Sequence, residues 1–196
     1  MAGKICISMI SDSDISLLLK HLQIPDLKFD LRPEWNSGNP NHRKEIHHQI
    51  KSLPFEWSAS ISHCGKAGGW VAVPAPYKIG FDIEEVSRVR PELARRICEE
   101  PDEEFTTAPS ASSLWVAKEA TFKGLFDINQ PTVISQIEIG PWEVYDSLEC
   151  FKLRFIEYQR TPEAYGVALQ KNELKLGFFV LNSQLWSYET EKSNRD

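Results

Sequence analysis

The sequence predicts an α+β fold of two halves, residues 1–75 and 76–190, followed by a polar tail at 191–196. Three observations support this prediction. Segments with the alternation of strands are interspersed with segments of helical spacing. Pro74, Pro76 and Tyr77 form a natural connector near the middle of the chain. The length of 196 residues suits either one domain of about 200 residues or two lobes of about 100.

The first half alternates between the two periodicities. A helix carrying Ile15, Leu18, Leu19 and Leu22 on one face is expected after the capping run Ser11-Asp12-Ser13-Asp14. The other elements expected here are a strand at 4–10, a loop at 32–41, a helix at 42–53, and strands at 58–62 and 69–73 around a glycine-rich turn.

The second half begins with a strand and two helices and then becomes mostly β. Its expected elements are a strand at 77–83, helices at 86–98 and 109–125, and strands at 133–139, 150–158, 164–170 and 174–181. In the strand at 150–158 we expect Phe151, Leu153 and Phe155 to face inward, and Lys152 and Arg154 to face outward.

Composition excludes several classes of protein. With 22 Lys+Arg against 28 Asp+Glu the net charge is −6, which argues against nucleic-acid binding and, at first sight, against an acidic partner. The sequence contains no run of 18 apolar residues, so it predicts no membrane span, and its N-terminus does not resemble a signal peptide. Scattered cysteines at 6, 64, 98 and 150 indicate reduced thiols without a zinc site. We therefore expect a cytoplasmic protein.

The segment Ile79-Gly80-Phe81-Asp82-Ile83-Glu84-Glu85 is the first candidate site. On a strand, Asp82 and Glu84 share one face, where two carboxylates can bind one Mg2+ ion. Gly80 allows a backbone or a ligand to come close. The alternative is a solvated strand end with incidental acids.

The second candidate is the helical segment from Leu114 to Leu125. Glu119 and Lys123 are four residues apart and share a face, with Trp115 one turn earlier on the same stripe. A carboxylate and an ammonium beside an aromatic ring suit a metal and a phosphate. The alternative is a surface Glu–Lys pair that contributes about 0.3–0.5 kcal/mol.

The third candidate is Ser62-His63-Cys64-Gly65-Lys66 at the end of a predicted strand. Its hydroxyl, imidazole and backbone N–H groups can contact phosphate. The alternative is a polar hairpin turn. A Ser/His/Asp hydrolase fits poorly, because adjacent Ser62 and His63 do not easily form the nucleophile–base bond and no G-x-S-x-G elbow occurs.

Together and in this order, the three segments resemble the 4′-phosphopantetheinyl transferase superfamily. The family pattern is a G-x-D-x-E strand followed some 35 residues later by a W-x-x-K-E-x-x-x-K helix, which here are Gly80 to Glu84 and Trp115 to Lys123. Ser62-His63 matches the S-H element of the longer, surfactin-synthetase-activating type. The motifs cover only about 20 residues.

The resemblance implies transfer of the phosphopantetheine arm of coenzyme A to a serine of an apo acyl or peptidyl carrier protein, releasing 3′,5′-ADP, as in a holo-[acyl-carrier-protein] synthase. It implies Asp82, Glu84 and Glu119 as ligands of Mg2+ or Mn2+, with Asp82, Glu119 and Lys123 as the catalytic residues. Glu119 is either a ligand alone or also the base for the carrier serine. Lys123 is the phosphate contact and proton donor, Lys118 its accessory, and Ser62 and His63 contact the CoA phosphates.

The length resembles the long type, which is a pseudo-dimer of two similar α+β halves, each a small antiparallel sheet packed with helices, with one site between them. We therefore expect a monomer. The chain departs from that type in lacking a Gly-Lys-Pro element before Ser62, the nearest match being Gly38-Asn39-Pro40. Candidates for the usual basic patch near the start are Arg32, Arg43 and Lys44, and for the middle glutamate Glu103 within 99–104.

A basic segment lies in this acidic neighbourhood. Residues 86–98 hold one acid, Glu92, and four arginines that we expect to dock the acidic helix of a carrier protein: Arg88, Arg90, Arg95 and Arg96. The alternative is a helix with local ion pairs.

Two rival functions stay open at this point. One is a Mg2+-dependent phosphohydrolase or nuclease that uses the same acids. The other is a non-catalytic relative that binds CoA or a carrier protein.

Overall fold

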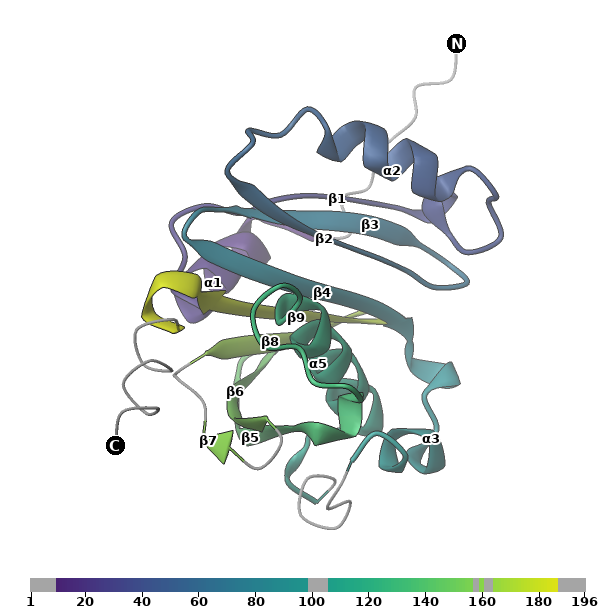
Figure 1. Ribbon diagram of the computed structural model, residues 1–196. Helices are drawn as coiled ribbons and strands as arrows, with labels where there is room; N and C mark the ends of the chain where they lie inside the picture. The colour runs from purple at the N-terminus through teal and green to yellow at the C-terminus, as the bar shows by residue number, and fades with distance from the viewer. Residues whose placement is uncertain (1–9, 99–105, 157–158, 161–163, 187–196) are drawn as a thin grey trace.

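The computed structural model describes residues 10–98, 106–156, 159–160 and 164–186, and it confirms a mixed α+β fold (Figure 1). Two antiparallel sheets form its centre, a three-stranded sheet of order β1-β3-β2 and a six-stranded sheet of order β4-β9-β8-β6-β5 with β7 paired to β6. Among the helices that the structure describes, none has the length and apolar character needed to cross a membrane.

The elements have the following bounds. The strands are β1 Lys28–Arg32, β2 Trp57–His63, β3 Gly68–Pro74, β4 Tyr77–Glu85, β5 Ile137–Tyr145, β6 Leu148–Ile156, β7 Gln159–Arg160, β8 Tyr165–Lys171 and β9 Leu174–Asn182. The helices are α1 Asp12–Leu22, α2 His42–Ile50, α3 Pro91–Arg95 and α5 Ala111–Gly124, with short 3-10 turns η1 Pro33–Trp35, η2 Val86–Arg88 and η3 Ile134–Gln136.

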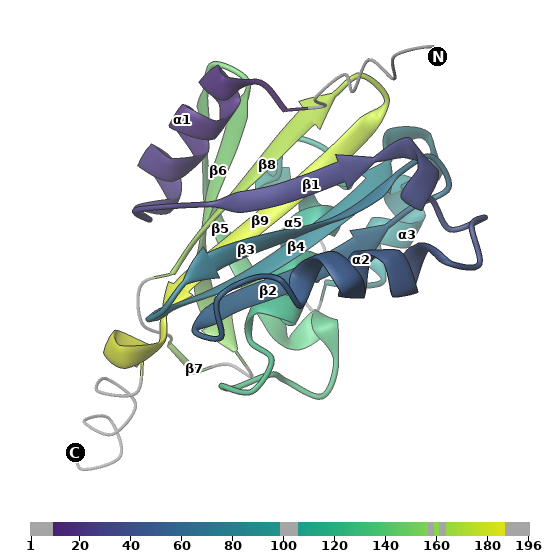
Figure 2. The same cartoon turned by 90° about the horizontal axis from the view of Figure 1, so that it is seen from above.

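Helices cover both faces of the larger sheet (Figure 2). Alternate side chains of β9 divide between two cores, because successive residues of a strand point to opposite faces. Phe178 lies in the core that contains Leu18 of α1, whereas Phe179 lies in the core that contains Leu114 of α5. The smaller sheet is covered by α2, whose Ile46 packs among tryptophans.

The two sheets meet at their edge strands, β2 and β4. The Ser60 hydroxyl accepts a hydrogen bond from the Phe81 N–H at 3.0 Å, and the Ser62 hydroxyl accepts one from the Ile83 N–H at 3.3 Å. Serine side chains thus satisfy two edge N–H groups of β4 that the larger sheet leaves unpaired. Along the chain, the three-stranded sheet ends at Pro74 and the larger sheet begins at Tyr77. Helix α1 precedes both sheets in the chain, yet it packs on the larger one.

Helix α5 lies unusually close to β4 and β9. A Cβ atom added at Gly80 would lie 1.8 Å from the carbonyl oxygen of Ala120, and one at Gly177 would lie 2.4 Å from that of Val116. Gly124 faces Gly80 from the helix side, where its Cβ would lie 3.0 Å from the Gly80 nitrogen. The expectation that Gly80 admits a close backbone is confirmed, and the backbone is that of α5.

Several expected elements are confirmed and others are corrected. Ser11 forms a capping box with Asp14, and Lys152 and Arg154 are exposed while Phe151 and Leu153 are buried. The continuous helix at 86–98 is wrong: Pro91 holds Arg90 extended (ψ 151°), so η2 and a five-residue α3 replace it. The strand expected from residue 133 begins only at 137, after η3, and β1 was not expected.

Some expectations fall outside the described part of the chain. These are the strand at 4–10 apart from Ile10, the polar tail at 191–196, Cys6 and Glu103. Cys64, Cys98 and Cys150 are free thiols, as expected.

Replacement of Gly80 by alanine tests the close packing of α5. We expect Gly80→Ala to lower the free energy of unfolding by about 3 kcal/mol, because its methyl group meets backbone that does not move easily. For a chain of this size this corresponds to a melting temperature lower by about 10 °C in a calorimetric scan. Gly38→Ala is the control, since its Cβ meets only the side-chain oxygen of Asn36. Equal melting temperatures for both variants would contradict the packing described.

Candidate functional site

The three segments selected from the sequence meet where β2, β4 and α5 come together. Asp82 of β4 is 6 % exposed and is the centre of the contact. Its Oδ1 accepts a hydrogen bond from the Ser62 hydroxyl at 2.7 Å and one from the Lys123 ammonium at 2.7 Å. Lys123 also donates to the Ser62 hydroxyl at 3.1 Å and to the Phe81 carbonyl at 3.2 Å. One lysine therefore links the helix to both sheets.

Strand alternation places the acids on the helix side of β4. Phe81 and Ile83 enter the core beneath α1, so Asp82 and Glu84 face α5. Glu119 and Lys123 share one face of α5 because they are four residues apart. The expected juxtaposition of these four side chains is supported by the electrostatic coupling of Glu119 to Asp82, Lys123 and Glu84.

Glu84 and Glu119 are half-buried, and each lies near other carboxylates. Burial raises the pKa of Glu119, and the nearby Asp82 carboxylate raises it further. Burial also raises the pKa of Glu84, and Asp82 again adds to the rise. Desolvated carboxylates that repel one another bind protons and cations more strongly than exposed ones do. The acids of this site thus favour a cation.

The acids do not form a ready-made cage in the structure. Among the described residues, no three His, Cys, Asp or Glu side chains lie close enough to hold a metal ion together. Asp82 instead lies against the ammonium of Lys123. The donor set of Asp82, Glu84 and Glu119 suits a hard cation by its oxygen chemistry, provided that water or phosphate oxygens complete the coordination.

His63, at the end of β2, contacts a residue that the sequence analysis did not select. Its ring lies against that of His42 of α2, with centroids 4.3 Å apart and the ring planes tilted by 41°. Burial lowers the pKa of His63, and the charges of His42, Arg43 and Lys123 lower it further. His42 is buried, and its Nε2 has no hydrogen-bond partner among the described residues. No local pattern pointed to His42, because the contact joins segments 21 residues apart in the chain.

The expectation that Lys118 assists Lys123 in binding coenzyme A is wrong. Its side chain is fully buried, and its ammonium donates to the carbonyl oxygen of Ile97 at 2.8 Å. Adjacent residues of a helix point about 100° apart, so Lys118 faces α3 when Glu119 and Lys123 face β4. Lys118 is a structural residue that joins α5 to the segment after α3.

Of the other basic residues considered, some form ion pairs and some are exposed on the surface. Lys66 contacts Glu85 at 3.9 Å and also pairs with Glu173. Arg32 forms an ion pair with Asp30. The four arginines expected to dock a carrier protein are all exposed: Arg88, Arg90, Arg95 and Arg96. Arg88 lies 3.9 Å from both Glu84 and Glu85.

Comparison of the chain with protein-family models and with curated proteins found no match. The functional argument therefore depends on the motifs and on the geometry of this site.

The Lys123–Asp82 contact can be measured by a double-mutant cycle. Lys123→Met removes the ammonium and leaves a buried carboxylate without it, so we expect a loss of about 2 kcal/mol in the free energy of unfolding. The loss is below that of a fully buried pair because the Lys123 side chain is 30 % exposed. In Lys123→Met/Asp82→Asn most of this loss should be recovered. Additive losses in urea unfolding would show that the pair is not coupled.

Proposed function

We propose that the protein transfers the 4′-phosphopantetheine arm of coenzyme A to a serine hydroxyl of an apo acyl or peptidyl carrier protein, in a reaction that depends on Mg2+. One observation carries this proposal: the Ser62–Asp82–Lys123 hydrogen-bond network joins the three motif segments of the phosphopantetheinyl transferase pattern. Segments 61 residues apart in the sequence meet with the side chains that the proposed reaction uses.

The proposed chemistry breaks the pyrophosphate bond of coenzyme A. An oxygen–phosphorus bond forms to the carrier serine, and 3′,5′-ADP leaves with the new negative charge. Lys123 contacts the phosphates and donates a proton to the leaving group. Glu119 accepts the serine proton, a role that suits a half-buried carboxyl with a raised pKa. Ser62 and His63 bind and orient the CoA phosphates at the end of β2.

Asp82, Glu84 and Glu119 would hold the metal ion in this proposal. A bound Mg2+ ion supplies positive charge that stabilises the developing charge on phosphate oxygens. The Lys123 ammonium is attracted to a phosphate group for the same reason that it is attracted to the Asp82 carboxylate. We therefore expect Lys123 to leave Asp82 and to contact a phosphate oxygen when substrate binds. Asp82 then becomes available as a ligand.

The nucleotide end of coenzyme A has a candidate place beside His63. The Gly-Lys-Pro element of the long type is absent, but α2 brings Arg43 close enough to influence the pKa of His63. Arg43 and Lys44 are both exposed in the first turn of α2. We propose that this turn contacts the 3′-phosphate.

The architecture that we propose is the pseudo-dimer of the long type, acting as a monomer. Its site lies between the two sheets, with Ser62 and His63 from one sheet and Asp82 and Glu84 from the other. A single chain then supplies both sides of the site.

The activity is tested by incubating the protein with coenzyme A, Mg2+ and an apo carrier protein and weighing the carrier by mass spectrometry. We expect the carrier to gain the mass of one phosphopantetheine arm, and the gain to disappear with EDTA. Asp82→Asn should abolish the gain. Asp127→Asn is the matched control, because Asp127 is an exposed acid just after α5 whose positive φ of 63° asparagine tolerates.

The same assay distinguishes the rival functions. Phosphate release without a carrier adduct indicates a phosphohydrolase. Binding of coenzyme A or of the carrier without any mass gain indicates a non-catalytic relative. Full activity of Asp82→Asn would overturn the role of Asp82.

Carrier docking is tested separately on Arg90 and Arg96. We expect Arg90→Glu/Arg96→Glu to raise the KM for the carrier about tenfold and to leave the affinity for coenzyme A unchanged, because the charges face solvent. Arg88 is excluded because it lies near Glu84, a proposed metal ligand. Lys20→Glu/Lys51→Glu, on α1 and directly after α2, is the control with the same change in net charge. An equal effect of both double variants on the KM would count against docking at this surface.

A further inference from the structure

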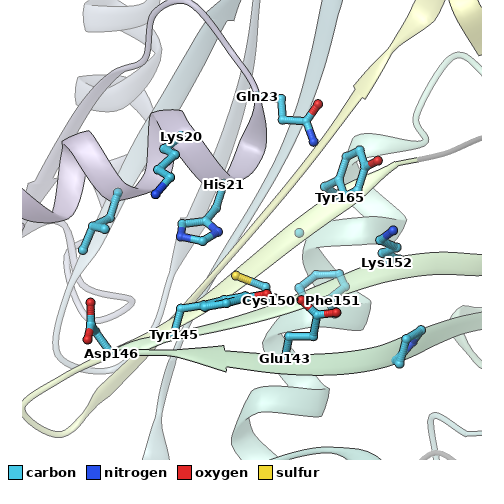
Figure 3. A pocket seen from close by; sticks show the side chains of 13 residues that line it. Lys20, His21, Gln23, Glu143, Tyr145, Asp146, Cys150, Phe151, Lys152 and Tyr165 are labelled. Atoms are coloured by element: carbon cyan, nitrogen blue, oxygen red, sulfur yellow. Dashed lines mark hydrogen bonds between the residues drawn. The ribbon is translucent and has the colours of Figure 1, made fainter.

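A second cavity lies away from the candidate site, between α1 and the strands β5, β6 and β8 (Figure 3). Its volume is about 470 Å3, within the usual range for pockets that bind small molecules. It shares no lining residue with the candidate site, and its cysteine packs against the core on the α1 side of the sheet.

The register of the strands builds the floor of this cavity. Glu143 of β5 pairs with Cys150 of β6, and Lys152 of β6 pairs with Tyr165 of β8. Residues two apart on a strand share a face, so Cys150 and Lys152 point to the same side together with their partners. Figure 3 shows the Cys150 sulfur and the Tyr165 ring beside the open space.

Helix α1 forms the opposite wall. Leu17, Lys20 and His21 are spaced three and four residues apart, so they line one face of the helix. Gln23 ends the helix in the left-handed conformation (φ 55°), and its side chain also lines the cavity.

The lining combines aromatic rings with two lysines, Lys20 and Lys152, and two acids, Glu143 and Asp146. His21 stacks on Tyr145 with centroids 5.0 Å apart, and the Lys152 ammonium lies 5.3 Å from the centre of the Tyr165 ring. Such rings offer flat faces to a flat ligand. The Tyr145 hydroxyl donates to Glu143, so that carboxylate already has a donor.

Cys150 adds an apolar surface to the floor. Burial raises the pKa of its thiol to about 11, with a further contribution from Glu143, so the thiol stays neutral. A neutral thiol behaves as a small, polarizable apolar group. Asp146 lies in the turn after β5, at the end of the floor away from Lys152.

We propose that this cavity binds a small, planar aromatic molecule that carries a negative charge. The rings of Tyr165 and Tyr145 and the Cys150 side chain contact the flat part of the ligand. Lys152 and Lys20, which lie on opposite sides of the cavity in Figure 3, supply the positive charge that attracts the anion. This site is independent of the proposed transfer reaction, because it uses none of the residues assigned to that reaction.

Two fluorescent probes with the same rings test the proposal. 8-Anilino-1-naphthalenesulfonate is an anion, and N-phenyl-1-naphthylamine is its uncharged counterpart. We expect the full chain to bind the anion more tightly. Lys20→Gln/Lys152→Gln should weaken binding of the anion about tenfold and leave the neutral probe unchanged, since two partly exposed charges contribute about 1–2 kcal/mol together. Lys28→Gln/Lys51→Gln, with both lysines outside the cavity and not assigned to coenzyme A, is the matched control.

A second arm locates the probe. Cys150→Phe fills the cavity and should abolish binding of both probes. As a measurement that needs no variant, the anion should protect Cys150 of the wild-type chain from methylmercury, a reagent that also binds protonated thiols, followed by mass spectrometry of its peptide. Absence of anion binding, unchanged binding in Cys150→Phe, unprotected Cys150, or equal weakening by the two double lysine variants would each overturn the proposal.

Discussion

The close packing of α5 against β4 and β9 is the constraint on which the candidate site depends. Glycines remove the side chains that would separate the helix from the sheet, so the backbone of α5 lies directly on two strands. Lys123 is one residue before Gly124, and Asp82 is two residues after Gly80. Because the glycines set the distance between these elements, they also set the distance between ammonium and carboxylate. A helix held farther from the sheet would move Lys123 away from Ser62 and Asp82.

The contact between the two sheets is built from the same atoms as the site. Ser62 accepts a hydrogen bond from the edge of β4 and donates one to Asp82, so it acts in sheet association and in the polar network together. The association of the sheets and the geometry of the site are therefore coupled. A polar network that is fully bonded in a buried position specifies one arrangement of the elements around it. The halves of the chain are not independent units, because the core beneath α1 contains residues from both.

Local patterns were sufficient for the elements of the site but not for all of its contacts. The alternation of β4 and the spacing along α5 correctly placed Asp82, Glu84, Glu119 and Lys123, because both are properties of the backbone. The continuous helix expected at 86–98 does not form, because Pro91 holds Arg90 in an extended conformation. Lys118 was misjudged because a lysine next to Glu119 looks functional in sequence, whereas its burial depends on α3. The contact between the His42 and His63 rings depends on how α2 lies over the smaller sheet, which no local pattern contains.

The charge of the site explains why the average charge of the chain is a poor guide to its partners. The net charge is −6, yet Glu84 and Glu119 have pKa values that are raised by burial and further raised by the nearby Asp82 carboxylate. Lys123 offsets part of this repulsion by lying on Asp82. An anionic substrate attracts the same ammonium. Movement of Lys123 away from Asp82 toward the substrate would leave Asp82, Glu84 and Glu119 facing one another. In the proposed reaction the phosphates and the cation therefore favour each other's binding, because each compensates charge that the other uncovers. In the proposed reaction this coupling follows from having one lysine between acids and phosphate, and it would let an acidic protein bind a polyanion.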